Sequence, residues 1–187
     1  QASGAKVIGL ANAGADTQNA IKQAAEFGIV QGGQRLAALL FTLSEVNGLG
    51  AEAAQGLTLT ESFYWNRTDA SREFGKRFIE RTQAMPNMIH AATYSAVTSY
   101  LKAIEAAGTD ETEAVAAKLK ELPVQDLFAE NGVVAANGRM IKDVYLMEVK
   151  APDQITEPWD YYNVLSTIPG DVAYIKPAES GCPLVTQ

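Results

Sequence analysis

One stretch of the sequence, residues 6–27 (KVIGLANAGADTQNAIKQAAEF), limits the fold more than any other. It begins with a short apolar run at residues 7–10, which predicts a strand that is buried on both faces of a sheet. A turn of small residues follows at 12–14, and apolar residues then recur at the spacing of an amphipathic helix that ends at Gly28. A strand, a turn and a helix in this order predict a β-turn-α unit of a parallel sheet.

The turn of this unit is the first candidate for a functional site, because ligands of such sheets bind in the crevice beyond the carboxyl ends of the strands. Asp16 is expected to cap the helix, since its carboxylate can accept hydrogen bonds from the free N–H groups of the first turn. Asn12 has two alternative roles: its side chain can cap its own turn, or it can contact a ligand.

Composition narrows the class of protein. With 187 residues and 47% hydrophobic content, the chain can bury a sizeable core in one or two domains. The net charge of −7, without any cluster of Lys and Arg, argues against a surface for nucleic acid or anionic lipid. No apolar run approaches the roughly 20 residues of a membrane-spanning helix.

The first residues, QASGAK, resemble the end of a helix and a loop before a strand, and no signal peptide is visible. We therefore expect the chain to be the C-terminal part of a longer protein. The single cysteine, Cys182, is close to the C-terminus. A lone thiol is usually inert, but in an exported protein it could pair with a partner in upstream sequence.

Two more strands are expected before residue 63. The apolar residues 35–42 predict a second buried strand, and the alternating residues 57–63 predict a half-covered one. Residues 44–49 read as a short helical turn. The aromatic cluster Phe63-Tyr64-Trp65 then leaves the sheet.

Residues 68–122 are helical throughout and predict three consecutive helices, interrupted at Pro86 and at Gly108. Asp110 and Glu113 are expected to start the third helix as a capping box. Three helices without intervening strands do not continue the strand-helix alternation of the first 63 residues. They are expected to pack as one layer on a sheet that is supplied from elsewhere.

The last part of the chain returns to strands. Two Asn-Gly pairs, at 131–132 and 137–138, predict a hairpin that ends in a long strand at 143–150. After Pro152 the sequence reads as irregular, and its aromatic residues near 160 are expected to anchor a short helix.

Signatures of several enzyme classes are absent. The sequence contains no phosphate-binding GxxxxGK[ST] loop, no dinucleotide-binding fingerprint and no GxSxG elbow. One histidine, His90, and one cysteine exclude histidine-pair zinc motifs and CxxC sites within this chain. We therefore expect a protein that is not an enzyme and that uses neither a cofactor nor a metal.

Two further features have alternative interpretations. His90 can be a partly buried helix-start histidine that bonds a backbone carbonyl, or it can face a ligand cleft together with the corner at residues 85–89. The cluster Phe63-Tyr64-Trp65 can shield the end of a strand, or it can form a stacking wall for the ring of a ligand.

Several phrases resemble the type I periplasmic solute-binding proteins of ABC transporters, in the family that includes binders of branched-chain amino acids and aromatic acids. The phrases are KVIGLANAGADTQNAIKQAAEFGI, AEAAQGLTLTESFYW, MPNMIHAATYSAVTSYLKAIEAAGTDE, DVYLMEVKAPDQ, PWDYY, STIPGD and SGCPLV. Together they extend over nearly the whole chain.

The resemblance implies an α/β fold with parallel sheets, in which two lobes joined by three crossing strands close around a small solute. It places residues 1–63 in the second lobe as an α/β segment and residues 64–128 in the first lobe as a helical segment. Residues 129–187 would form a crossing hairpin, a strand returning to the second lobe, and a C-terminal tail. About half of the protein, with the first-lobe sheet, would be missing. We expect this N-terminal half, as another chain or as a swapped partner, to cover Phe74, Phe78 and Leu101.

The resemblance also implies a set of ligand-contacting positions in the cleft. They come from the turn after the first strand, the end of the second strand and the corner before the long helix, and the aromatic cluster adds one more. The set is Asn12, Ala13, Phe41, Thr42, Tyr64, Met88, Ile89 and His90.

This chain departs from the amino-acid binders of the family at two points. The turn at 12–14 has no tyrosine, and the segment 41–43 has no acidic residue to hold an α-ammonium group. A small apolar or aromatic carboxylate therefore fits better as the ligand. The expected function is that of an extracytoplasmic, periplasmic binding component of an ABC importer, with the inner-membrane permease as partner. The alternatives are a ligand-sensing domain of the same fold in a receptor or regulator, and a branched-chain amino acid binder.

Overall fold

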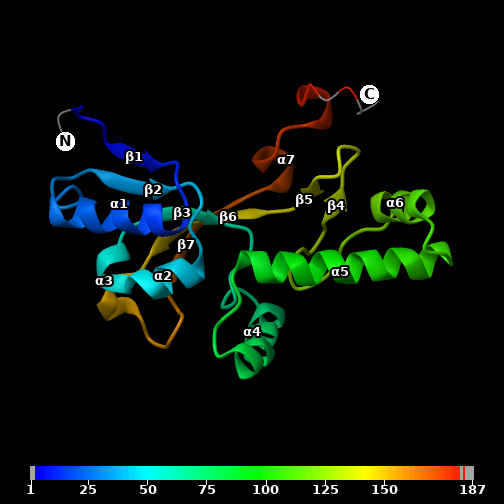
Figure 1. Cartoon of the computed structure of the whole chain (residues 1–187), viewed down its shortest axis with the longest axis horizontal. Helices are drawn as coiled ribbons and strands as arrows, with labels where there is room; N and C mark the ends of the chain where they lie inside the picture. Colours follow the sequence, from blue (N-terminus) through cyan, green and yellow to red (C-terminus); the bar gives the residue numbers. More distant parts are fainter. Residues whose placement is uncertain (1–2, 182, 184–187) are drawn as a thin grey trace. The chain divides into compact units, whose positions relative to one another are not determined.

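The computed structural model describes residues 3–181 and residue 183 of the chain (Figure 1), so Cys182 lies outside the described residues. The chain forms two compact units. The first consists of the residues up to Met88 together with Tyr145–Thr167, and the second begins with Ile89–Val144 and continues from Ile168. These units do not follow the predicted boundaries at 63/64 and 128/129. The assignment of those segments to the lobes of a longer protein stays a prediction.

The first unit is built on a five-stranded sheet, whose order is β1-β2-β3-β6-β7. The first three strands are parallel to one another, and β6 runs antiparallel to β3. The mostly parallel α/β fold that the sequence predicted is therefore confirmed. The strands are β1 (Val7–Leu10), β2 (Arg35–Ala38), β3 (Thr58–Glu61), β6 (Val144–Val149) and β7 (Tyr162–Ile168).

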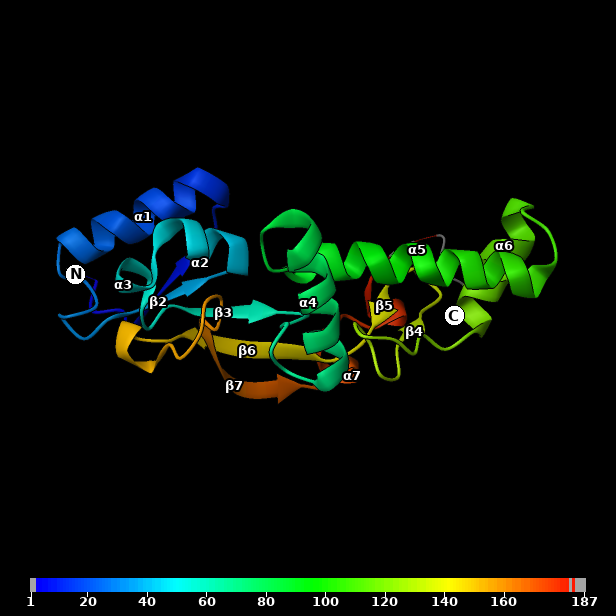
Figure 2. The same cartoon turned by 90° about the horizontal axis from the view of Figure 1, so that it is seen from below.

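Three helices of this unit gather on one side of the strands in Figure 2: α1 (Gly14–Glu26), α2 (Leu43–Leu49) and α3 (Ala51–Ala54). α1 turns Thr17 and Ile21 inward, and Val46 of α2 is fully buried. After β3 the chain enters α4 (Asp69–Thr82), whose first turn is capped by the Thr68 hydroxyl, which accepts a hydrogen bond from the Ser71 N–H. A short 3₁₀ helix, η1 (Pro152–Gln154), lies between β6 and β7.

Some local predictions for the first unit are wrong. β1 is not buried on both faces, because it is the edge strand of the sheet and Val7 is 55% exposed. The second strand ends at Ala38 rather than at Thr42, because Thr42 is the N-cap of α2. Asp16 lies in the first turn of α1, but Ala13 is the N-cap and no side chain caps this helix locally.

The C-terminal segment after Pro152 is more regular than predicted. Residues expected to anchor a short helix instead lead into β7, which starts at Tyr162 and completes the sheet beside β6. The predicted hairpin exists as a separate two-stranded sheet of β4 (Val133–Val134) and β5 (Met140–Ile141), and the long strand that follows it joins the main sheet.

The second unit contains α5 (Met88–Ala107), whose first residue still belongs to the first unit, and α6 (Thr112–Glu121). α6 starts one residue later than predicted: its N-cap is Glu111, whose carboxylate accepts the N–H groups of Glu113 and Ala114. Ser95 of α5 donates a 2.6 Å hydrogen bond to Asp126, which also accepts two backbone N–H groups from the following loop. α7 (Gly170–Ala173) and the 3₁₀ helix η2 (Pro177–Glu179) complete the unit.

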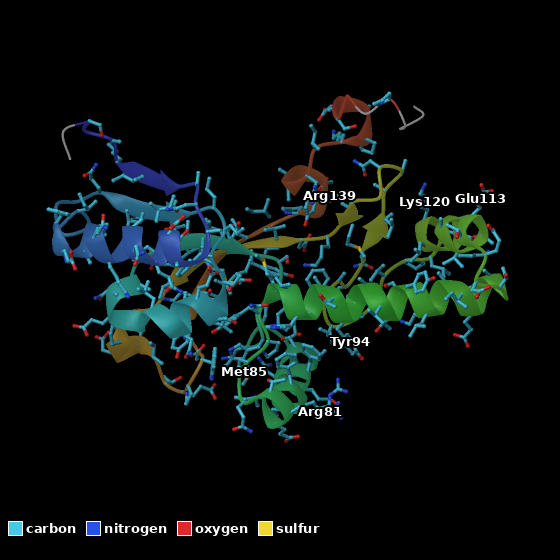
Figure 3. All side chains as sticks on the ribbon, in the orientation of Figure 1. Arg81, Met85, Tyr94, Glu113, Lys120 and Arg139 are labelled. Carbon is cyan, nitrogen blue, oxygen red and sulfur yellow. The ribbon has the colours of Figure 1, made fainter. Side chains whose placement is uncertain are left out.

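One face of α5 carries large apolar side chains that remain between 42% and 58% exposed in this chain. Figure 3 shows Tyr94 projecting from the side of α5 that faces away from α6 in that view. We call this set the α5 face: Ile89, Tyr94, Val97, Tyr100 and Leu101. In contrast, Phe74 of α4 is buried against Phe63 and Phe78 within the first unit. Within the described residues, no helix combines the length and the apolar character that crossing a membrane requires.

Candidate functional site

The turns that follow β1 and β2 lie at the same edge of the sheet. The two strands are parallel, and their last residues, Leu10 and Ala38, are paired in register. Asn12 and Ala13 follow β1. Asn12 is half-buried, and its Oδ1 accepts a 3.0 Å hydrogen bond from the hydroxyl of Thr17, so its side chain is tied to the helix that follows it. Ala13 is exposed.

Glu45, in the first turn of α2, holds these two turns together. Its Oε2 accepts hydrogen bonds from the backbone N–H of Thr42 at 2.7 Å and from the Thr42 hydroxyl at 3.0 Å. Its Oε1 accepts the backbone N–H of Gly14 at 3.1 Å. One carboxylate therefore links the turn after β1 to the turn after β2, where Phe41 and Thr42 are both buried.

The corner before α5 joins the same group. The side-chain amide of Asn87 donates to the hydroxyl of Ser44 at 3.1 Å and approaches the hydroxyl of Thr42 at 3.5 Å. Met88 follows directly and is half-buried. The first unit thus brings Asn12, Ala13, Phe41, Thr42 and Met88 onto segments that hydrogen bonds connect.

Ile89 and His90 belong to the second unit. Both are exposed in this chain. His90 lies in the first turn of α5, as the helix-start interpretation predicted, but it is exposed rather than partly buried in this chain.

Glu61, the last residue of β3, is 1% exposed and lies beneath these turns. Its Oε1 accepts the backbone N–H of Leu43 at 3.1 Å and the hydroxyl of Tyr162 at 3.3 Å, whereas Oε2 has no hydrogen-bond partner of normal geometry. Burial raises the pKa of Glu61 from 4.5 to about 8, although the N–H groups of Leu43 and Met88 and the Tyr162 hydroxyl lower it in part. Glu61 is therefore mainly a neutral acid at pH 7.

Tyr64 is committed to a second buried network. Its hydroxyl donates a 2.7 Å hydrogen bond to Asp160 and accepts the backbone N–H of Tyr162 at 3.3 Å. Asp160 also accepts from Asn66 at 3.2 Å and forms an ion pair with Lys150. Burial raises the pKa of the Tyr64 hydroxyl, as does its hydrogen bond to Asp160. Burial alone would raise the pKa of Asp160, but the hydrogen bonds from Lys150, Tyr64 and Asn66 lower it overall.

The rings around Tyr64 are packed inside the first unit. Phe63, Tyr64 and Trp65 are each buried, and the indole N–H of Trp65 donates to the backbone carbonyl of Trp159 at 2.9 Å. Phe63 meets Phe74 edge to face, with ring centroids 6.1 Å apart. This burial agrees with the interpretation that the cluster shields the end of a strand. A ligand could contact Tyr64 only if the cluster opened.

The residues at the centre of these networks, Glu45, Glu61, Asn87 and Asp160, were not among the sequence-based candidates. A signal for Glu45 was present, because Thr42-Leu43-Ser44-Glu45 fits the S/T-x-x-E capping box. For the other three, the partners are distant in sequence, and no local pattern marks them. Among the described residues, no three His, Cys, Asp or Glu side chains are grouped so that they could hold a metal ion.

This chain is an α/β protein in which connected turns follow the carboxyl ends of parallel strands. Proteins of this class bind ligands at those turns. The family described as periplasmic binding protein matches residues 1–154, and the chain therefore belongs to this family. The type I branch that the sequence resembled, that of the binding proteins of ABC transporters, is confirmed.

Solved structures agree with this assignment. A periplasmic binding protein from Burkholderia mallei is 49% identical with a TM-score of 0.92, and the match covers 99% of this chain and 49% of that one. A branched-chain amino acid ABC transporter periplasmic ligand-binding protein from Burkholderia xenovorans LB400 is 36% identical with a TM-score of 0.91, covering 99% and 50%. The chain thus spans about half the length of these proteins.

A third structure shows a likeness of the fold alone. It is a solute-binding protein of an ABC transporter from Rhodopseudomonas palustris HaA2 in complex with p-hydroxybenzoic acid, 22% identical, with a TM-score of 0.74 and coverage of 90% of this chain and 46% of that one. A comparison with curated protein sequences found no match.

Proposed function

We propose that this chain is part of the solute-binding component of an ABC importer, that it acts in the periplasm, and that it delivers its solute to an inner-membrane permease without catalysing a reaction. The observation that carries the proposal is the hydrogen-bonded connection of three turns by Glu45 and Asn87 at the carboxyl ends of parallel strands. A binding surface needs its contact groups in fixed positions, and these bonds fix them before any ligand arrives.

The proposed ligand is a small apolar or aromatic carboxylate. Leu39 and Leu40, directly after β2, are exposed, and they supply apolar surface beside Thr42. Both carboxylate oxygens of Glu45 already accept backbone N–H groups, so Glu45 is not free to serve as a dedicated partner for an α-ammonium group. The contacts would come from Asn12, Ala13, Phe41, Thr42, Tyr64, Met88, Ile89 and His90, as the sequence suggested. Because Phe41 and Thr42 are buried, we expect them to act through backbone groups or as the floor of the site.

A thermal-shift experiment on the full-length protein tests this proposal. p-Hydroxybenzoic acid, benzoate, a short fatty acid, leucine and valine are compared as probes. An acid that binds the folded protein is expected to stabilise it by about 2.7 kcal/mol at 100 times its dissociation constant, which is a clear rise in Tm. Stabilisation by leucine or valine alone would instead identify a branched-chain amino acid binder and contradict the carboxylate preference.

The remaining half of the protein is the proposed partner of the α5 face. The chain covers about half of the Burkholderia proteins, and this face leaves five large apolar side chains largely exposed. Apolar surface of this kind gains roughly 25 cal/mol for each Å² that is removed from water. We propose that an N-terminal half, in the same or another chain, packs on it.

Val97→Lys in the full-length protein tests this partner. If the face is covered, the buried ammonium group is expected to cost about 3 kcal/mol of unfolding free energy in a urea titration. Ala117→Lys, at an exposed position of α6, is the control and is expected to stay within about 0.5 kcal/mol of the wild type. An equally small effect of Val97→Lys would mean that the α5 face stays in water.

A further inference from the structure

Glu45 occupies an unusual position between two helices. α1 has no side-chain cap of its own, since its N-cap is Ala13. The first N–H groups of a helix need an acceptor, and Glu45 of α2 supplies one by accepting the N–H of Gly14, 31 residues earlier in the chain. The same carboxylate accepts the N–H and the hydroxyl of Thr42, at the start of its own helix.

We propose that Glu45 is a positioning residue of the ligand site, which sets the separation of the Gly14 and Thr42 turns and makes them move together. This inference rests on the proposed function, because it assigns Glu45 a role in forming the site rather than in touching the solute. Each carboxylate oxygen already accepts a backbone N–H, one from each turn. A displacement of one turn therefore pulls on the other through a single rigid group.

The charge and the symmetry of the carboxylate matter for this role. Glutamine has nearly the same shape, but it has one acceptor oxygen and an amide group that can only donate. In Glu45→Gln, the oxygen can accept from Gly14 or from Thr42, and the amide then faces the N–H of the other turn. One of the two turns is released, and the helix N-terminus there also loses a neighbouring negative charge.

Amide hydrogen exchange, measured site by site on the full-length protein, is the direct test. Loss of one hydrogen bond of about 1 kcal/mol is expected to speed exchange at Gly14 or Thr42 by roughly five- to tenfold in Glu45→Gln. Glu52→Gln, an exposed glutamate of α3 without such bonds, changes the charge equally and is expected to leave both rates unchanged. Unchanged rates at both amides in Glu45→Gln would overturn the proposal.

Coupling of the turns distinguishes positioning from a merely structural role. Gly14 has a φ of +60°, so Gly14→Ala strains its own turn. This change is expected to speed exchange at Thr42 when Glu45 is present and to have no such effect in the Glu45→Gln background. Equal effects in the two backgrounds would overturn the coupling.

Affinity completes the test. Glu45→Gln is expected to weaken binding of the acid that stabilises the wild type by about tenfold, while Glu52→Gln leaves it unchanged. Unchanged affinity together with faster exchange would contradict a role in the site. If the wild-type protein bound none of the probes, the proposed function would fail, whereas the exchange rates would still decide whether Glu45 couples the turns.

Discussion

Replacement of Glu61 by glutamine is expected to stabilise the protein at alkaline pH and to remove a large part of its pH dependence. The pKa of Glu61 is raised from 4.5 to about 8 by burial, so the folded state holds a proton that the unfolded state releases. The stability that this proton provides is complete below pH 4.5 and is lost as the pH rises from 4.5 to 8. At about 1.4 kcal/mol per pKa unit, the loss amounts to several kcal/mol at pH 9.

Urea titrations from pH 5 to pH 9 measure this effect. The amide of Glu61→Gln stays neutral throughout and can still accept the N–H of Leu43 and the hydroxyl of Tyr162. We expect the variant to lose less stability than the wild type between pH 5 and pH 9, and to be the more stable protein at pH 9. Glu52→Gln, on the surface, serves as the charge-matched control. If the unfolding free energy of Glu61→Gln fell with pH as steeply as that of the wild type, Glu61 would be ionised in the folded protein at neutral pH.

Asp160→Asn is expected to be the most destabilising isosteric change in the first unit. The asparagine keeps an acceptor for the Tyr64 hydroxyl but leaves Lys150, whose side chain is 14% exposed, without its negative partner. Loss of one partner of a buried ion pair costs about 3–5 kcal/mol, because the remaining charge is uncompensated. Urea denaturation at pH 7 gives this cost directly, with Asp153→Asn in the exposed η1 segment as the control.

A second substitution separates charge from packing. Lys150→Met in the Asp160→Asn background removes the uncompensated ammonium group and is expected to restore a large part of the stability. If the double variant were no more stable than Asp160→Asn, the cost would come from the hydrogen bonds to Tyr64 and Asn66 instead. The pKa of Asp160 lies below its ordinary value of 3.8, so the stability from this carboxylate is present at neutral pH and is lost as the pH falls through that lowered pKa.

Local patterns predicted most of the architecture. The apolar run before the 12–14 turn, the helical spacing after it, and the interruptions at Pro86 and Gly108 correspond to β1, α1, α4 and α5. The errors arose where neighbours that are distant in sequence decide. β1 looked like a buried strand because its residues are apolar, but nothing in residues 7–10 reveals that the strand pairs on one side only. β7 was missed because prolines surround it in the sequence and because it is ordered as a strand by its pairing with β6.

The candidate site divides in the same way. The turns after β1 and β2 could be proposed from the strand-helix pattern, since parallel strands bring their carboxyl ends to one edge. What holds the turns depends on Glu45 reaching Gly14 and on Asn87 reaching Ser44, contacts that span 31 and 43 residues. The buried state of Glu61 depends on Tyr162, 101 residues away, so its raised pKa has no sequence signature.

The spatial order of the strands also governs when the first unit can be completed during synthesis. β1, β2 and β3 are close in sequence and can pair early, whereas β6 and β7 follow much later. Tyr64, shortly after β3, is 96 residues from its hydrogen-bond partner Asp160, shortly before β7. Until β6 has been added, β3 has an unpaired edge, which is open to pairing with other chains. Protection by a chaperone is therefore of more use to this protein than to one whose neighbouring strands are made one after another.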